Sequence, residues 1–292
     1  MSAIASFGQY TPDYSQYMFN GLAINPAYTG SREALSTSLL YRKQWVNFEG
    51  APQNITFSAH GPLKNEKIAL GLFVTNESYP TSSNTGFYAN YAYRININNA
   101  KLSFGLKAGI KSVTENFSDV STLIGVDPAF EEAAGTSFLP NFGGGIYYYT
   151  DNYYVGISVP DFLETIKVGD SYTVQHNFSN YNYHLTGGYL LSISDNFKLK
   201  PSTLLKYQYG EIQADLNNNF ILFNDRLWLG ASYRLSKAVV GIIEVQVNNQ
   251  LKVGYSYDYS LGDLSAYNDG SHEIFLRYEF KYKVETFNPR YF

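Results

Sequence analysis

The chain has 292 residues and a formal net charge of −4, with 28 Tyr and 20 Phe but no Cys. The lack of Cys excludes disulfides, thiolate metal sites and Cys nucleophiles, and the lack of a basic excess argues against nucleic-acid binding. No run approaches the roughly 18 apolar residues of a transmembrane helix, but alternating transmembrane strands are not excluded because their polarity averages out. The abundant Tyr and Phe favour β-strands.

The first 33 residues do not alternate. Residues 1–8 combine apolar and small side chains like the end of a signal peptide, although no basic segment precedes them. We interpret them as a signal-peptide remnant, with an ordinary N-terminus as the alternative. Residues 9–33 contain the turn signals Asn25-Pro26 and Thr29-Gly30. They are expected to form an N-terminal element separate from the strands that follow.

The remaining residues, 34–292, break into fourteen segments that alternate between apolar and polar side chains. A period of two predicts strands with unlike faces, and turn signals separate the segments. The predicted strands are 34–46, 53–60, 66–76, 84–97, 100–114, 138–149, 153–159, 181–193, 197–207, 211–223, 226–236, 238–248, 250–259 and 271–283.

Two segments alternate less cleanly than the others. In 238–248, Val240 and Ile242 share a face with Glu244, and in 211–223 Asn218 interrupts the apolar face. We interpret these as strands whose inner end is plugged, the alternative being misplaced boundaries.

The connections between segments differ in length on the two sides. Short turns rich in Asn and Asp follow the even-numbered segments, and longer loops, such as 115–137 and 160–180, follow most odd-numbered ones. This pattern is typical of outer-membrane barrels, whose short turns face the periplasm. Most segments also reach the roughly 9–11 residues that cross a bilayer. The sequence therefore predicts an all-β, antiparallel transmembrane barrel of about 14 strands, with both termini periplasmic.

Three local features complete this prediction. Residues 9–33 are expected to form either a lumen plug or a periplasmic segment, and residues 15–30 are expected to start from the short-turn side. The stretches "PAFEEAA" in 115–137 and "PDFLETI" in 160–180 each predict a short helical turn after a Pro. In the last strand, one face should contact lipid and the other the lumen. The expected lipid face is Ile274, Leu276, Tyr278, Phe280 and Tyr282, and the expected lumen face is Glu273, Arg277, Glu279, Lys281 and Lys283.

A search for catalytic or metal-binding patterns gives no candidate. Ser271, His272 and Glu273 are the residue types of a hydrolase triad, but contiguous residues on a strand point to opposite faces. The four His residues lack metal-ligand spacing. The glycines of "FGGGIYYY" at 142–149 lack the context of a phosphate loop, and close packing explains them better. We therefore expect no catalytic residues, no metal and no cofactor.

Three stretches taken together resemble one family. They are "SQYMFNGLAINPAYTGSRE" (Ser15–Glu33), "YRKQWVNFEGAPQNITFSAHGPL" (Tyr41–Leu63) and "GYSYDYSLGDLSAYNDGSHEIFLRYEF" (Gly254–Phe280). Their order and spacing resemble the PorP/SprF family of Bacteroidetes outer-membrane proteins over essentially the whole chain. The motif residues are Gln16, Tyr17, Asn20, Asn25, Pro26, Tyr28, Gly30, Arg42, Gln44, Trp45, Gly50, Ala51, Pro52, Ser271, His272, Glu273 and Ile274.

The resemblance implies a non-enzymatic component of type IX secretion and gliding motility. Such a barrel would bind and anchor, or help export, a secreted surface adhesin through the adhesin's C-terminal domain. It would sit in outer-membrane lipid and contact periplasmic secretion or motility components. The residues expected to bind partners are Trp45, Phe48, Gly50, Pro52, Asn25, Pro26, Tyr28 and His272.

Other assignments remain open for some of these residues and for the function. Trp45 also suits an aromatic girdle at the membrane interface, and Asn25 to Tyr28 also suit a fixed turn that plugs the barrel. The alternative function is porin-like passage of small solutes through the lumen. A soluble, aromatic-rich β-protein is a second alternative, which the segment lengths and the turn pattern disfavour.

Overall fold

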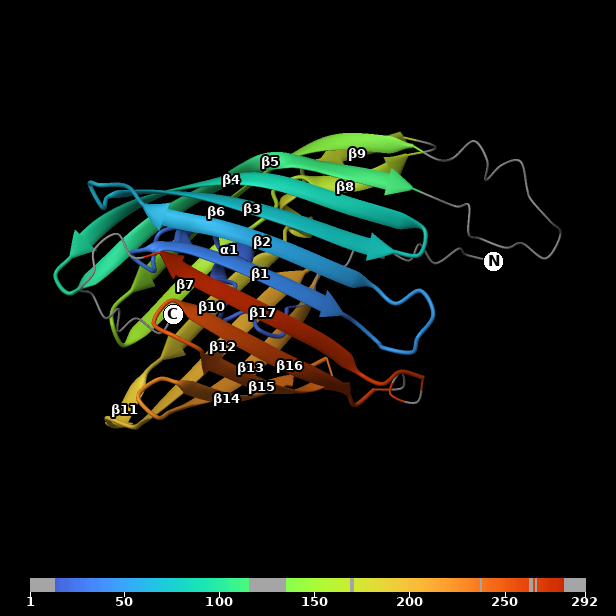
Figure 1. Cartoon of the computed structure of the whole chain (residues 1–292). Helices are drawn as coiled ribbons and strands as arrows, with labels where there is room; N and C mark the ends of the chain where they lie inside the picture. The colour runs from blue at the N-terminus through green and yellow to red at the C-terminus, as the bar shows by residue number, and fades with distance from the viewer. Residues whose placement is uncertain are drawn as a thin grey trace.

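The computed structural model describes residues 14–115, 135–168, 171–236, 238–262, 265 and 267–280. These residues form a short helix, two 3-10 turns and seventeen strands (Figure 1). Among them, no helix has the length and apolar character needed to cross a bilayer. The bounds are α1 Gly21–Ile24, η1 Pro26–Tyr28, β1 Leu35–Lys43, β2 Gln53–Pro62, β3 Ile68–Tyr79, β4 Ser82–Ile97, β5 Ala100–Glu115, β6 Thr136–Tyr149, β7 Tyr153–Val159, β8 Glu164–Val168, β9 Ser171–Gln175, η2 Phe178–Asn180, β10 Tyr183–Tyr189, β11 Leu191–Ser194, β12 Phe197–Gln208, β13 Glu211–Leu222, β14 Leu227–Arg234, β15 Ala238–Gln246, β16 Leu251–Ser260 and β17 Ser271–Phe280.

All strands except β8 and β9 form one closed antiparallel barrel. Each wall strand pairs with its neighbours along the chain, and β1 closes the barrel against β17 from Leu35↔Phe280 to Lys43↔His272. Both β10 and β11 pair with β12, so they are two parts of one wall strand. The barrel therefore has fourteen strands, and the predicted fold is confirmed. We call the end where β1 ends and β2 begins the loop end, and the opposite end the turn end.

Each predicted segment contains a wall strand, within a few residues of its expected bounds. One of these strands is interrupted, because β10 stops at Tyr189 and β11 starts at Leu191. The interruption faces Pro201 of β12, which has no N–H to donate to the ladder.

The expectation of a helical turn in "PDFLETI" is wrong. Residues 164–168 form β8, which pairs with β9 in a hairpin at the loop end. The β-branched residues Thr165, Ile166 and Val168 favour a strand over a helix. The other expected turn, in "PAFEEAA", lies outside the described residues.

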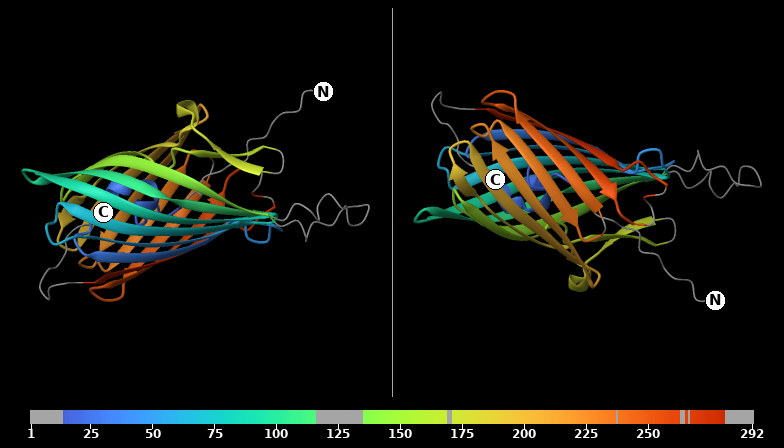
Figure 2. Two further views of the ribbon diagram at one scale, coloured as in Figure 1. Left: turned by 90° about the horizontal axis from the view of Figure 1, so that it is seen from above. Right: turned by 90° about the horizontal axis from the view of Figure 1, so that it is seen from below.

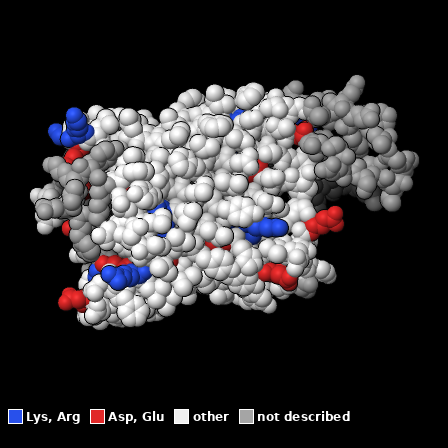
Figure 3. All heavy atoms as spheres, in the orientation of Figure 1, with Lys and Arg blue, Asp and Glu red and all other residues white. Residues whose placement is uncertain are grey.

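The two faces of the wall have opposite polarity. In β5, Phe104, Leu106 and Ile110 point outward and are 41%, 63% and 52% exposed, whereas Ser103 and Lys107 point inward and are buried. On the face shown in Figure 3, most of the charged atoms lie toward the two ends of the barrel. An apolar belt between polar ends matches a barrel wall in contact with lipid.

The closing strand confirms its predicted faces. Ile274, Leu276 and Phe280 are exposed on the outer face, and Glu273 and Arg277 are buried in the lumen. The expected positions of Lys281, Tyr282 and Lys283 fall outside the described residues.

Residues 14–33, which we call the plug, fill the lumen. Figure 2 shows this N-terminal segment, including α1, enclosed by the strands. Its side chains pack against inward-facing wall residues, as where the Phe19 ring lies 5.5 Å from the Trp228 ring and 5.8 Å from the Phe275 ring. Val240 and Ile242 are buried in the same apolar cluster. This explains why β15 has apolar residues on both faces from Val239 to Ile243.

The plug runs through the lumen once, from the loop end to the turn end. Ser15 bonds to Asp258 near the loop end of β16, and Arg32 pairs with Glu279 at the turn end of β17, at 2.5 Å. The expectation that residues 15–30 start from the short-turn side is therefore wrong. The two described ends of the chain, at residues 14 and 280, lie at opposite ends of the barrel.

Candidate functional site at the loop end

Residues from the three family-like stretches meet in one buried cluster just inside the loop end. We call Ser15, Gln16, Arg42, Asp258 and Glu273 the latch. The Glu273 carboxylate accepts hydrogen bonds from the backbone N–H groups of Ser15 and Gln16, at 3.0 and 2.8 Å. The Arg42 guanidinium donates to the Ser15 hydroxyl and to the Asp258 carboxylate, both at 2.6 Å. The latch thus joins the plug to β1, β16 and β17.

The charged side chains of the latch are paired within a wider network. Arg234 on β14 donates to Asp215 at 3.1 Å and lies 3.4 Å from Asp258. Arg42 also lies 3.5 Å from the Glu273 carboxylate. Buried charges are tolerated only when they are paired and hydrogen-bonded. The strands supply such partners because alternation places these side chains on the inner face.

A cavity of about 480 Å³, which we call the vestibule, opens at the loop end beside the latch. Its lining contains the latch residues Arg42 and Asp258, so the latch forms part of its surface. The rest comes from both sides of the barrel mouth. The other lining residues are Gln44, Trp45, Pro52, Gln53, Asn54, Glu77, Tyr79, Arg234, Ser236, Ala238, Ser260, Asn268, Gly270 and Ser271.

The first loop and the last loop are joined to form one side of the rim. The backbone N–H of Val46 donates to the Gly270 carbonyl at 2.8 Å, and the backbone N–H of Asp269 donates to the Val46 carbonyl at 2.9 Å. The Trp45 N–H donates to the Ser271 hydroxyl at 3.2 Å. Gly50 has φ +75°, and a Cβ there would lie 2.5 Å from the Pro80 ring. A glycine is therefore required for this loop to pack against the β3–β4 turn.

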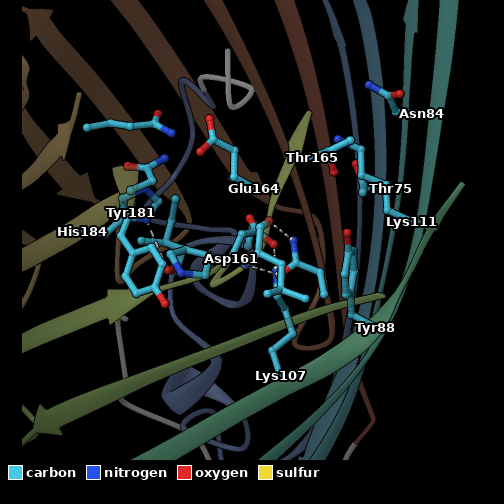
Figure 4. A pocket seen from close by; sticks show the side chains of 18 of the residues that line it. Thr75, Asn84, Tyr88, Lys107, Lys111, Asp161, Glu164, Thr165, Tyr181 and His184 are labelled. Carbon is cyan, nitrogen blue, oxygen red and sulfur yellow. Dashed lines mark hydrogen bonds and ion pairs between the residues drawn. The ribbon is translucent and has the colours of Figure 1, made fainter. Parts of the chain in front are cut away.

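A second, smaller cavity of about 160 Å³ lies at the other side of the mouth. Figure 4 shows Tyr88 and Lys111 on one wall and Tyr181 and His184 on the other. The chain that leads into β8 contributes Asp161, which pairs with Lys107 at 2.8 Å.

The β8–β9 hairpin is fastened beside this cavity. Lys167 and Tyr172 both donate to the carboxylate of Glu115, at 2.6 and 2.5 Å. Tyr209, in the turn after β12, donates to Glu164. Burial, and then this hydrogen bond, raises the pKa of the Tyr209 hydroxyl. Because a neutral hydroxyl keeps its donor proton, the hairpin stays bonded to the turn after β12.

The structure separates the expected partner-binding residues into three groups. Trp45, Phe48, Gly50 and Pro52 lie together at the rim. His272 points outward and contacts the Tyr255 hydroxyl at 2.6 Å. Asn25, Pro26 and Tyr28 are buried in the plug. The rim group and the outward-facing His272 can be reached from outside the barrel without displacing the plug, whereas the third group cannot.

The buried Asn25 fastens the middle of the plug to the wall. Its side-chain nitrogen donates to the carbonyls of Ile146 and Ile157, at 3.0 and 3.3 Å. Glycines make this approach feasible: a Cβ on Gly145 would lie 2.2 Å from the Asn25 side-chain oxygen, and one on Gly105 would lie 2.1 Å from the Ala27 nitrogen. Close plug packing therefore explains one glycine of "FGGGIYYY".

The sequence interpretation did not single out Arg234, Asp215 or Asp258. Alternation puts Asp258 on the inner face of its strand, but nothing local says that it meets Arg42, which is 216 residues away. Ser271 and Glu273 are buried whereas His272 faces outward, so these three residues are not arranged as a triad. Among the described residues, no group of three or more His, Cys, Asp or Glu side chains is placed to hold a metal.

Comparison with protein families gives one match over almost the whole chain. A family model described as "Type IX secretion system membrane protein PorP/SprF" matches residues 6–278. No curated protein matches the chain.

Comparison with solved structures finds bacterial channels and outer-membrane proteins. The CymD monoaromatic hydrocarbon channel is 15% identical, with a TM-score of 0.54 over 92% of this chain and 94% of that chain. The toluene transporter TbuX of Ralstonia pickettii is 10% identical, with a TM-score of 0.51 over 91% and 93%. Omp33 of Acinetobacter baumannii is 9% identical, with a TM-score of 0.50 over 85% and 99%. At such identities the likeness shows the barrel fold alone.

Proposed function

The chain belongs to the PorP/SprF family of type IX secretion system membrane proteins, and on this premise we propose that it is a binding barrel for secreted cargo. It binds and anchors, or helps export, a surface adhesin through the adhesin's C-terminal domain. The observation that carries the proposal is the convergence of the three family-like stretches on the latch and the vestibule.

The filled lumen supports binding over passage. The plug occupies the lumen from Ser15 at the loop end to Arg32 at the turn end, and its side chains belong to one buried cluster with the wall. The two larger cavities within the lumen both open at the loop end. A protein that holds a partner at its mouth needs such a surface, whereas a porin needs a continuous aqueous path.

We place the cargo at the loop-end rim. There the indole of Trp45 and the ring of Phe48, with centroids 6.3 Å apart, lie beside the polar vestibule. Aromatic anchors surrounded by hydrogen-bonding groups are typical of stable protein interfaces. In this proposal the long loops face the cell exterior and the turns face the periplasm, where secretion or motility components contact the barrel.

Co-purification from native membranes tests this function. The tagged barrel, extracted in mild detergent, should carry a large secreted protein in a fixed ratio, and deletion of the barrel should release that protein into the medium. Recovery of the barrel alone, with the adhesin still attached to cells after deletion, would contradict the proposal.

The porin alternative has its own test. In planar bilayers the plugged barrel should show no steady conductance, because the plug occupies the lumen from the loop end to the turn end. Stable, ion-selective openings of the unmodified protein would favour passage of small solutes instead.

A further inference from the structure

The two ends of the plug are fixed to opposite ends of the barrel by separate contacts. At the loop end, Ser15 bonds to Asp258 at 2.7 Å and to Glu273 at 3.0 Å. At the turn end, the Gly30 N–H donates to His60 at 3.0 Å, and Arg94 donates to the Gly30 carbonyl at 2.7 Å. The strand registers are continuous, so they fix the position of each wall partner along the barrel axis.

The middle of the plug runs in the same direction. Asn20 bonds to Thr56, and Asn25, further along the plug, bonds to carbonyls of β6 and β7. Thr29 follows, and it packs against Gly71 near the turn end of β3. From residue 15 to residue 32, the contacts therefore follow one another from the loop end to the turn end, and the plug does not reverse direction.

We infer that the chain crosses the membrane once through the lumen, ahead of the fourteen strands. The part of the chain that precedes Tyr14 is attached on the side of the long loops, and the part that follows Phe280 is attached on the side of the short turns. Tyr14 and Phe280 thus lie on opposite sides of the membrane. This inference goes beyond the proposed cargo binding, and it holds for either orientation of the barrel.

Partners at the two ends of the barrel therefore meet different parts of the chain. A partner that covers the loop end meets both the rim and the start of the plug, since Tyr14 lines the cavity at the other side of the mouth. A component on the turn side meets the turns, the end of the plug at Arg32 and the end of β17.

Cysteine labelling tests the inference directly, because the chain has no Cys of its own. We would insert a short epitope with one Cys directly before Tyr14, and use Phe48→Cys and Leu63→Cys as references for the loop end and the turn end. Phe48 and Leu63 are both 44% exposed. Cells are treated with a membrane-impermeant maleimide before and after lysis. The inserted Cys should behave like Phe48→Cys, and a match to Leu63→Cys would overturn the inference.

This comparison separates the inference from the proposed function. If Leu63→Cys is labelled on intact cells and Phe48→Cys is not, the outward orientation of the loops fails. The inference is still judged by which of the two references the inserted Cys follows.

Disulfide mapping tests the direction of the plug without an insertion. The matched pairs are Ser15→Cys with Asp258→Cys, and Thr29→Cys with Gly71→Cys. The Ser15 and Asp258 oxygens are 2.7 Å apart, and a Cβ on Gly71 would lie 3.3 Å from the Thr29 methyl group. A disulfide requires Cα atoms within about 7 Å. The matched pairs should oxidise, as seen by a shift on a non-reducing gel.

The exchanged pairs provide the control. Ser15→Cys with Gly71→Cys, and Thr29→Cys with Asp258→Cys, should stay reduced in the folded barrel. The Thr29 and Gly71 pair leaves the latch intact, so it remains informative if the latch pair prevents folding. Oxidation of the exchanged pairs in place of the matched ones would overturn the inference.

Discussion

The backbone N–H of Ser15 donates to the carboxylate of Glu273 at 3.0 Å, across 258 residues of sequence. This contact joins the start of the plug to the strand that closes the barrel. Because β17 also pairs with β1 along its whole length, the plug and the seam depend on the same strand. Ser15 and Glu273, which belong to the family-like stretches, therefore stabilise the fold in addition to any contact with a partner.

Replacing Glu273 should destabilise the barrel and loosen the plug. In Glu273→Ala, the N–H groups of Ser15 and Gln16 lose their acceptor inside the lumen. Breaking a buried, hydrogen-bonded charge pair costs about 3–5 kcal/mol in free energy of unfolding. The measurement is the temperature at which the folded, fast-migrating band converts to the unfolded band on a gel.

The matched control is Glu211→Ala, which removes a carboxylate from an exposed position at the rim. It should leave the conversion temperature unchanged. Equal shifts for the two variants would show that the Glu273 contact contributes nothing special.

A methyl group at Gly105 should displace the plug. A Cβ there would lie 2.1 Å from the backbone nitrogen of Ala27, and backbone cannot yield as a side chain can. Overpacking of this kind costs about 1–3 kcal/mol. We expect Gly105→Ala to lower the conversion temperature and to produce intermittent conductance in planar bilayers.

Gly241→Ala serves as the comparison, since a Cβ at Gly241 meets nothing within 4 Å. It should behave like the unmodified protein in both measurements. Tolerance of Gly105→Ala would mean that the plug does not approach the wall of β5 so closely.

The barrel could be predicted from the sequence because its signals, alternation and turn composition, depend only on residues that are close together in the chain. Alternation in 101–111 assigns Leu106 to one face and Lys107 to the other, and the turns between strands carry Asn and Asp. These signals need no knowledge of distant residues. The even strand count then follows from the number of segments.

The plug could not be oriented in the same way. Residues 14–33 do not alternate, and their direction is fixed only by distant partners such as Asp258 and Glu279. The helical turn at 160–166 was predicted from Pro160 alone, and the pairing of β8 with β9 outweighed that signal. Of the residues that line the vestibule, the sequence interpretation names Trp45 and Pro52 as partner-binding residues but does not name Arg234.

A charge on the outer face should prevent insertion in a depth-dependent way. Leu106 lies near the middle of β5 and is 63% exposed, so Leu106→Lys places an ammonium group against the centre of the bilayer. The expected cost is about 2–4 kcal/mol at the midplane and about 0–1 kcal/mol near the interface. Phe138→Lys, near the loop end of β6, provides the interface comparison. Folding into lipid vesicles over a denaturant series should show a large loss only for Leu106→Lys, and equal losses would contradict an outer face in contact with lipid.

Truncation of the rim aromatics should weaken cargo binding without unfolding the barrel. Trp45 lines the vestibule and packs edge-on against Phe48, and both side chains lie outside the plug cluster. Aromatic anchors at interfaces contribute about 2 kcal/mol or more, which corresponds to a loss of roughly 30-fold in affinity. We expect Trp45→Ala to reduce the amount of adhesin that co-purifies, with an unchanged conversion temperature. The control is Leu63→Ala, which removes an exposed apolar side chain at the turn end and should retain the adhesin. Equal retention by Trp45→Ala and Leu63→Ala would place the binding surface away from the vestibule.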